Sequence, residues 1–175
     1  MNNNVCVNVL SLNVRGIRDL TKRKSIFTWV RNRKVDIIFL QETYSTSDVI
    51  DSWKYQWPGD MYYSHGSNHS KGVLVLIRET LQFELKPVKK DTQGRFVIVE
   101  ALDQECPVLL INIYAPNKTN EATDFYENLR STLLESNYDQ DYKIVIGGDF
   151  NDPLNFQLDS YGSKTEKKRG SYKNS

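Results

Sequence analysis

The sequence predicts a mixed α/β fold of the α+β class, with helices packed on a sheet whose strands are mostly antiparallel. Short segments rich in valine, isoleucine and leucine, which are typical of buried strands, recur along the chain up to Asp149. Two longer segments repeat their apolar residues every three or four positions instead, as helices do. Several strand-like segments follow one another with only short polar turns between them, which favours antiparallel neighbours.

The strands are predicted from eight apolar segments of four to eight residues, which is the usual length of a strand. In chain order, these segments are residues 5–12, 36–40, 61–64, 72–77, 83–89, 96–102, 108–113 and 143–146. The turns between the middle segments are short and polar, for example at residues 78–80 and 91–94. We therefore expect a mixed sheet in which the middle strands run antiparallel to their neighbours.

Residues 21–34 form the first predicted helix, and residues 48–55 form a second, shorter one. In the first helix, Ile26, Trp29 and Val30 recur at helical spacing and are expected to face the sheet. The remaining positions of this helix are rich in lysine and arginine, which suits a solvent-exposed face. A basic face of this kind also suits contact with nucleic acid, and the sequence leaves both interpretations open.

Residues 120–134 form the third predicted helix. Phe125 and Leu129 are four residues apart, so they lie on the same face and are expected to pack on the sheet. Thr119 or Asn120 is placed to cap the start of the helix, because a side-chain oxygen there can accept a hydrogen bond from a free backbone N–H. No repeat or internal linker interrupts the pattern, so residues 1–160 are expected to form one domain.

Charge is nearly balanced over the 175 residues, with 23 lysines and arginines, 22 aspartates and glutamates, and a net charge of +1. The distribution is uneven, because residues 161–175 carry five basic side chains and one acidic side chain. We expect this segment to be a basic, disordered tail, since polar charged runs are usually solvated. Contact with nucleic acid is the alternative role for this tail.

The two cysteines, Cys6 and Cys106, lie in strand-like segments and are expected to be free thiols in a reducing compartment. The start of the chain lacks the basic and apolar segments of a secretory signal. The longest apolar run, residues 73–77, is far shorter than the roughly 20 residues that a membrane-spanning helix needs. These features predict an intracellular protein without a membrane segment.

Oxygen-bearing side chains follow four of the predicted strands, at the point where each strand ends. These side chains are Asn13, Glu42, Tyr114, Asp149 and Asn151. Open α/β sheets usually bind their ligands at the carboxyl ends of the strands. Carboxylates and amides there suit Mg²⁺, which prefers oxygen ligands and needs only one or two carboxylates. They equally suit a phosphate or an attacking water, and each residue alone has a plainer interpretation as a turn or surface residue.

Four short motifs, in this order, resemble the endonuclease/exonuclease/phosphatase superfamily. The motifs are Leu12-Asn13-Val14-Arg15-Gly16, Leu40-Gln41-Glu42-Thr43, Asn112-Ile113-Tyr114-Ala115-Pro116-Asn117 and Gly147-Gly148-Asp149-Phe150-Asn151. Over about residues 7–160, the chain resembles above all the apurinic-type endonuclease domain of LINE-type non-LTR retrotransposons, which is associated with a reverse transcriptase. The resemblance implies a sandwich of two sheets flanked by helices, and a metal-dependent phosphodiester hydrolase that cuts DNA.

The resemblance also implies a role for each matching residue. Glu42 matches the magnesium ligand of the family, and Asn13 matches an amide beside the metal. Tyr114 matches a phenol that contacts the phosphate, and Asn151 matches an amide that holds the scissile phosphate. Asp149 matches the residue that orients or deprotonates the attacking water. Mg²⁺ is the implied cofactor, with Mn²⁺ as the alternative, and DNA in the nucleus is the implied partner.

Two further positions refine the resemblance. Asn117 matches a position that touches the nucleic-acid backbone. Arg15 stands where several apurinic endonucleases carry a carboxylate. This departure weakens a function in DNA repair and leaves the relationship with transposon endonucleases intact.

The larger departure is that the family's late Asp–His pair has no match. The two histidines, His65 and His69, precede the last predicted strand and are interpreted as loop residues near the rim of the pocket. We therefore expect a C-terminally truncated domain with an incomplete second sheet, weak or absent cleavage, and an uncovered sheet face that favours self-association. The alternative function is a catalytically inactive, nucleic-acid-binding remnant of a retrotransposon. A phospholipid or inositol phosphate substrate is a third, less favoured interpretation.

Overall fold

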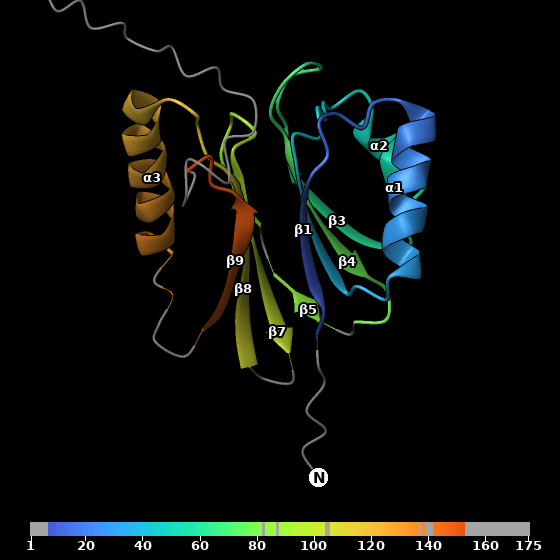
Figure 1. Cartoon of the computed structure of the whole chain (residues 1–175). Coiled ribbons are helices and arrows are strands. Elements are labelled where there is room, and N and C mark those ends of the chain that lie inside the picture. The colour runs from blue at the N-terminus through green and yellow to red at the C-terminus, as the bar shows by residue number, and fades with distance from the viewer. Residues whose placement is uncertain are drawn as a thin grey trace, which may run out of the picture.

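Two sheets pack face to face, and helices cover the outer face of each (Figure 1). The computed structural model describes residues 7–152, apart from residues 82, 87, 104–105, 137 and 139–141. The predicted tail at 161–175 and the last part of the predicted domain lie outside these residues. Within them, the predicted mixed, mostly antiparallel sheet architecture with flanking helices is confirmed.

The first sheet has the strand order β1-β2-β4-β3. Its strands are β1 (Val9–Asn13), β2 (Ile37–Gln41), β3 (Gly59–Ser64) and β4 (Val73–Arg78). β1 and β2 are parallel, whereas β4 is antiparallel to both of its neighbours. All five residues of β2 are buried, because this central strand is covered on both faces.

The second sheet has the order β5-β7-β8-β9, with β6 also paired to β7. Its strands are β5 (Glu84–Leu85), β6 (Lys89–Lys90), β7 (Phe96–Asp103), β8 (Cys106–Tyr114) and β9 (Lys143–Asp149). The single strand predicted at 83–89 is wrong, because two short strands pair with β7 there instead. The sequence places Pro87, which has no N–H to donate to a ladder, between them.

The first two helices lie on the outer face of the first sheet. In α1 (Leu20–Asn32), the Asp19 carboxylate caps the start by accepting a hydrogen bond from the Lys22 N–H at 2.7 Å. The predicted buried face of this helix is partly wrong: Phe27 and Val30 are buried, but the Trp29 side chain is 42% exposed. Trp29 instead lies under the Arg33 guanidinium. The second helix is α2 (Ile50–Lys54), shorter than predicted.

The third helix, α3 (Thr119–Leu134), covers the outer face of the second sheet (Figure 1). Its predicted contacts are confirmed, because Phe125 and Leu129 are buried against β7 and β8 residues. The predicted cap is wrong: Lys118 occupies the N-cap position, and no side chain caps the helix there. None of the helices in the described part of the chain has the length and hydropathy that crossing a bilayer requires.

The core has three layers, and the central one joins the two sheets. Alternate side chains of β2 and β4, such as Phe39 and Val75, pack between the sheets against β7 and β8 residues such as Val99 and Leu110. The other two layers lie between each sheet and its helices. The two sheets therefore cover each other's inner faces, and the exposed apolar side chains of β9, Ile144 and Ile146, lie at the edge of the second sheet.

Candidate active site

The carboxyl ends of four strands meet at one rim of the sandwich. β1 and β2 are parallel in the first sheet, and β8 and β9 are parallel in the second. β1 and β9 are edge strands of the two facing sheets and run beside each other (Figure 1). Parallel strands end at the same edge of a sheet, so the polar residues that follow these four strands come together.

Hydrogen bonds link four of the predicted site residues directly. The Asn13 side-chain amide donates to Glu42 Oε1 at 2.9 Å and to Asp149 Oδ2 at 2.8 Å. The Tyr114 phenol donates to the same Glu42 Oε1 at 3.0 Å. Residues separated by as many as 136 positions therefore form one connected cluster of two carboxylates, an amide and a phenol. All four side chains are partly buried.

The other two predicted residues follow β8 and β9, and Asn151 contacts the cluster through its backbone N–H. The Asn151 side chain donates to the Ala115 carbonyl at 2.6 Å, and its backbone N–H donates to Asp149 Oδ1 at 3.0 Å. Asn151 therefore ties the end of β9 to the segment that follows Tyr114. Asn117 is exposed, and its contact with a nucleic-acid backbone stays a prediction.

The backbone adopts sparsely populated conformations at this rim. Glu42 has φ of 52° and Asn151 has φ of 49°, values that are uncommon for residues with a side chain. Each costs about 1–3 kcal/mol and persists only where surrounding contacts hold it, often at functional sites. At Gly148, φ is 146° and an added Cβ would lie 2.0 Å from the Ile113 carbonyl oxygen. Only glycine allows β9 to approach β8 there, which places Asp149 opposite Tyr114.

A buried polar network anchors the strands that carry Glu42 and Tyr114. Asn112 is fully buried between the sheets, and its amide donates to the carbonyls of Leu40 at 3.0 Å and Leu74 at 2.8 Å. The Gln41 amide donates to Asn112 Oδ1 at 2.7 Å and to the Ser11 hydroxyl at 3.1 Å. The network thus connects β8 with β1, β2 and β4, just behind the site. The apolar pattern of this strand does not reveal the role of Asn112, although a single asparagine in an otherwise apolar strand is a usable signal.

Both phenols that contact Glu42 are held in the neutral form. Burial is the main cause that raises the pKa of Tyr114 to about 12, with the hydrogen bond to Glu42 and its charge adding to the shift. Burial and Glu42 likewise raise the pKa of Tyr44, whose phenol donates to Glu42 Oε2 at 3.1 Å. Tyr44 was also missed in the sequence. Its position two residues after Glu42 was the only signal for it.

The residues present fit a divalent cation of the Mg²⁺ type. No lysine or arginine in the described part of the chain forms an ion pair with Glu42 or Asp149, so two carboxylates share a site without a compensating charge. Among the described residues, no group of three or more His, Cys, Asp or Glu side chains is placed to hold a metal. Mg²⁺ does not need such a cage, because it keeps several waters and binds through one or two carboxylates.

Asn13 takes part in the cluster through its nitrogen. The amide group faces both carboxylates, and its Oδ1 accepts a hydrogen bond from the Arg15 backbone N–H at 3.1 Å. Two carboxylate neighbours require a donor, which fixes this orientation of the amide. In this arrangement Asn13 bridges the carboxylates, and ligation of a metal by its oxygen stays a prediction.

Neither histidine contacts the cluster. His65 follows β3, stacks on the Tyr63 ring at 4.5 Å, and its Nδ1 lies 3.1 Å from the Ser45 hydroxyl. Burial, followed by the charge of Lys90, lowers the pKa of His65 below its usual value. His69 lies in an exposed turn. Within the residues described, no imidazole is therefore available to the site as an acid or base.

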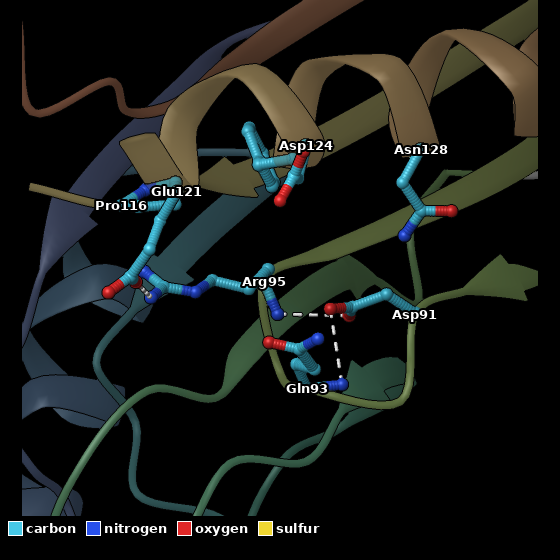
Figure 2. Close-up of a pocket in the computed structure, with 8 residues that line it drawn as sticks. Asp91, Gln93, Arg95, Pro116, Glu121, Asp124 and Asn128 are labelled. Carbon is cyan, nitrogen blue, oxygen red and sulfur yellow. Dashed lines mark hydrogen bonds and ion pairs between the residues drawn. The ribbon is translucent and has the colours of Figure 1, made fainter. Parts of the chain in front are cut away.

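A separate polar pocket of about 330 Å³ is lined by Arg95 and Pro116, among other residues. It lies between the turn before β7 and the inner face of α3, and three of its lining residues, Asp91, Glu121 and Asp124, are acidic. Figure 2 shows Arg95 reaching from the start of β7 to Glu121 on α3, where the two form an ion pair at 3.5 Å. The Arg95 guanidinium also lies 5.3 Å from the centre of the Tyr114 ring. Arg95 therefore supports the Tyr114 ring from the side of this pocket.

A family model described as the Endonuclease/Exonuclease/phosphatase family matches residues 8–164. The chain belongs to this family. The predicted superfamily is thereby confirmed. The transposon TX1 uncharacterized 149 kDa protein of Xenopus laevis is 29% identical over 167 residues, which is 95% of this chain. An exodeoxyribonuclease of Bacillus subtilis (strain 168) is 25% identical over 151 residues, or 82% of the chain.

The solved structures that resemble this Endonuclease/Exonuclease/phosphatase chain share its fold. TDP2 from C. elegans covers 84% of the chain, with a TM-score of 0.64 and 22% identity. D. rerio TDP2 complexed with a single strand DNA product covers 87%, with a TM-score of 0.62 and 16% identity. The endonuclease domain of TRAS1, a telomere-specific non-LTR retrotransposon, covers 85%, with a TM-score of 0.58 and 16% identity. Similarity to TX1 and TRAS1 agrees with the predicted resemblance to retrotransposon endonucleases.

The chain corresponds to only part of these proteins. It spans 12% of the TX1 protein and 58% of the exodeoxyribonuclease. It covers 48% of the C. elegans TDP2 structure, 63% of the D. rerio TDP2 structure and 62% of the TRAS1 domain.

Proposed function

We propose that this chain is a metal-dependent phosphodiester hydrolase that acts on DNA. The observation that carries the proposal is the cluster at the strand ends, where the Asn13 amide donates to both Glu42 and Asp149 and no lysine or arginine among the described residues forms an ion pair with either carboxylate. Membership of the Endonuclease/Exonuclease/phosphatase family supports phosphoester chemistry. The DNA product bound to D. rerio TDP2 and the nuclease names of other relatives support DNA as the substrate.

Each residue of the cluster has a role in this proposal. Glu42 would hold the cation, Mg²⁺ or Mn²⁺, which supplies charge stabilisation for the phosphate and the leaving oxygen when bound. Among the described residues, one hydrogen bond reaches each oxygen of Asp149 and leaves an acceptor position on both, so Asp149 is suited to orient a water and accept its proton. The Asn151 amide has a second N–H beside the one that it donates to the Ala115 carbonyl, so it is suited to donate to charge that develops on a phosphate. The neutral Tyr114 phenol would do the same once its one hydrogen turns from Glu42 to the phosphate. Asn13 holds the two carboxylates beside each other by donating a hydrogen bond to each.

We expect cleavage to be slow, because the described residues place no histidine at the cluster. A missing acid or base commonly lowers a rate by 10²–10⁴-fold. The test is nicking of supercoiled plasmid under single-turnover conditions with Mg²⁺, comparing wild type with Glu42→Gln and Asp149→Asn. Glu127→Gln is the matched control, since Glu127 is exposed on α3.

The proposal predicts slow nicking that requires Mg²⁺, is unchanged in Glu127→Gln and falls to the level without enzyme in both site variants. Nicking that is equal in wild type and both site variants would place the activity elsewhere and reject the proposed site. No nicking by wild type at any enzyme concentration would reject the enzymatic function itself.

Binding of nucleic acid without cleavage is the second candidate function, and the absence of a described histidine at the site favours it. Retention of short duplex DNA, measured over a range of salt concentrations, tests it separately from cleavage. Binding through phosphates weakens steeply as salt rises, because counterions are released. Binding that is absent, or independent of salt, would exclude the binding function.

Action in the nucleus, association with a reverse transcriptase and self-association all remain predictions. The described residues show no bare sheet face, but Ile144 and Ile146 are exposed on the edge strand β9. Sedimentation of the wild type and of Ile146→Lys over a concentration range tests self-association, since only the wild type is expected to form larger species.

A further inference from the structure

A second tyrosine contacts the candidate metal ligand. Tyr44 donates its phenol hydrogen to Glu42 Oε2 at 3.1 Å. Asn13 and Tyr114 both donate to the other oxygen, Oε1, at 2.9 and 3.0 Å. The two oxygens of one carboxylate are therefore held by different donors from three segments of the chain.

The hydrogen bonds leave little of this carboxylate free. A carboxylate offers about four acceptor positions, two on each oxygen. Among the residues that the structure describes, the Asn13 and Tyr114 hydrogen bonds occupy both positions on Oε1, and the Tyr44 hydrogen bond occupies one on Oε2. One position remains, on Oε2, beside the Tyr44 phenol.

We propose that Tyr44 is a positioning residue, which orients the Glu42 carboxylate and thereby determines the acceptor position that a divalent cation takes. The inference rests on the proposed function, because it assigns Tyr44 a part in the same metal site. A neutral donor suits this part. It fixes the carboxylate without offsetting the negative charge that attracts the cation, as a lysine or arginine would.

The backbone holds Tyr44 in an unusual conformation that aims its ring at Glu42. Its φ is 58°, which is a genuine outlier for a bulky residue and persists only where neighbouring contacts hold it. The Tyr44 N–H donates to the Lys71 carbonyl at 3.0 Å. Its ring lies against Gly16, where an added Cβ would come within 2.5 Å of ring carbon Cδ2. The Gly16 N–H in turn donates to the Glu42 carbonyl at 2.6 Å, so the ring and the carboxylate are fixed by the same loops.

Mn²⁺ binding measured by electron paramagnetic resonance tests this role without relying on cleavage. Tyr44→Phe removes one oxygen and keeps the ring against Gly16. Loss of a residue that orients a metal ligand typically weakens metal binding 10–100-fold, and we expect a loss in this range. Tyr62→Phe is the matched control, because Tyr62 is a partly buried phenol on β3 that forms no hydrogen bond with the site. Its Mn²⁺ affinity should equal that of wild type.

A double-mutant cycle separates positioning from a general structural effect. In a Glu42→Gln background, Tyr44→Phe should change Mn²⁺ affinity less than twofold, and the melting temperatures of all variants should agree. Wild-type Mn²⁺ affinity in Tyr44→Phe would overturn the inference while leaving the proposed function standing. An equal loss with and without Glu42 would also overturn it, because Tyr44 would then act by another route. No Mn²⁺ binding by wild type would reject the proposed metal site and this inference with it.

Discussion

Replacing Asn112 by leucine should destabilise the chain strongly, because this side chain connects the two sheets behind the site. Asn112 is fully buried and takes part in three hydrogen bonds, two to carbonyls of the first sheet and one from the Gln41 amide. Leucine has a similar volume and leaves no space for water. The change therefore leaves one Gln41 amide N–H without its partner, and it removes the second hydrogen bond that each of the two carbonyls accepts beside the strand ladder.

The size of the effect follows from the three hydrogen bonds that are lost. Each buried hydrogen bond contributes about 1 kcal/mol net, so the loss of three lowers the free energy of unfolding by about 3 kcal/mol. Domains are stable by only about 5–15 kcal/mol in total. For a chain of this length, a loss of about 3 kcal/mol corresponds to a decrease of roughly 6–12 °C in melting temperature.

Urea unfolding followed by circular dichroism measures this loss, with the slope of the transition showing whether the same surface unfolds. Asn128→Leu is the matched control, because Asn128 is exposed on α3 and its replacement should change stability by no more than about 0.5 kcal/mol. If Asn112→Leu matched this control, the hydrogen bonds between the sheets would not anchor the strands that carry Glu42 and Tyr114, and the reasoning would be refuted.

Three further predictions concern the site and its surroundings. Tyr114→Phe should lower single-turnover nicking by roughly 10²-fold, because it removes the one phenol hydrogen, which Glu42 accepts in this structure and which would turn to the phosphate during cleavage. Tyr126→Phe changes an exposed phenol on α3 and should leave the rate unchanged; equal rates for the two variants would exclude a role for the Tyr114 phenol. Burial lowers the pKa of His65, so the unfolded state binds more protons than the folded state as pH falls below about 6.5. Between pH 7 and pH 5 the free energy of unfolding should therefore decrease more for wild type than for His65→Gln. Equal decreases in the two proteins would contradict this prediction. Lys22 lies at the end of α1 nearest the site, where its ammonium group donates a hydrogen bond to the Arg15 carbonyl. Lys22→Ala should reduce the slope of DNA affinity against salt concentration, both on logarithmic scales, by about 1, whereas Lys34→Ala should leave this slope unchanged. Equal effects of the two variants would place DNA along the whole helix.

The sequence predicts the strands well, because apolar β-branched runs such as residues 73–77 are buried whichever sheet they join. The pattern of apolar residues does not show that the strands divide into two facing sheets, because this division depends on contacts between distant segments. Only the family resemblance predicts the two sheets. The buried face of α1 is also set by tertiary packing. Trp29 has the spacing of a core residue, but Phe27 fits the layer next to Trp57, and Trp29 stacks with Arg33 instead.

The sequence also predicts that four of the site residues meet at one place. Asn13, Glu42, Tyr114 and Asp149 follow strands whose ends meet at one edge, and the hydrogen bonds join all four. The contact of Tyr44 with Glu42 is not predictable in this way. It depends on positive φ values at both residues, which turn two side chains of one loop toward each other in a manner that no periodic pattern encodes.

Anomalous diffraction from crystals soaked in Mn²⁺ tests the central claim most directly, because it locates the cation without any assay of activity. A single manganese peak at the Glu42 carboxylate, absent from crystals of Glu42→Gln, is the result that this account predicts. Manganese bound elsewhere on the chain, or no peak at Glu42 while its hydrogen bonds to Asn13 and Tyr114 are intact, would contradict it.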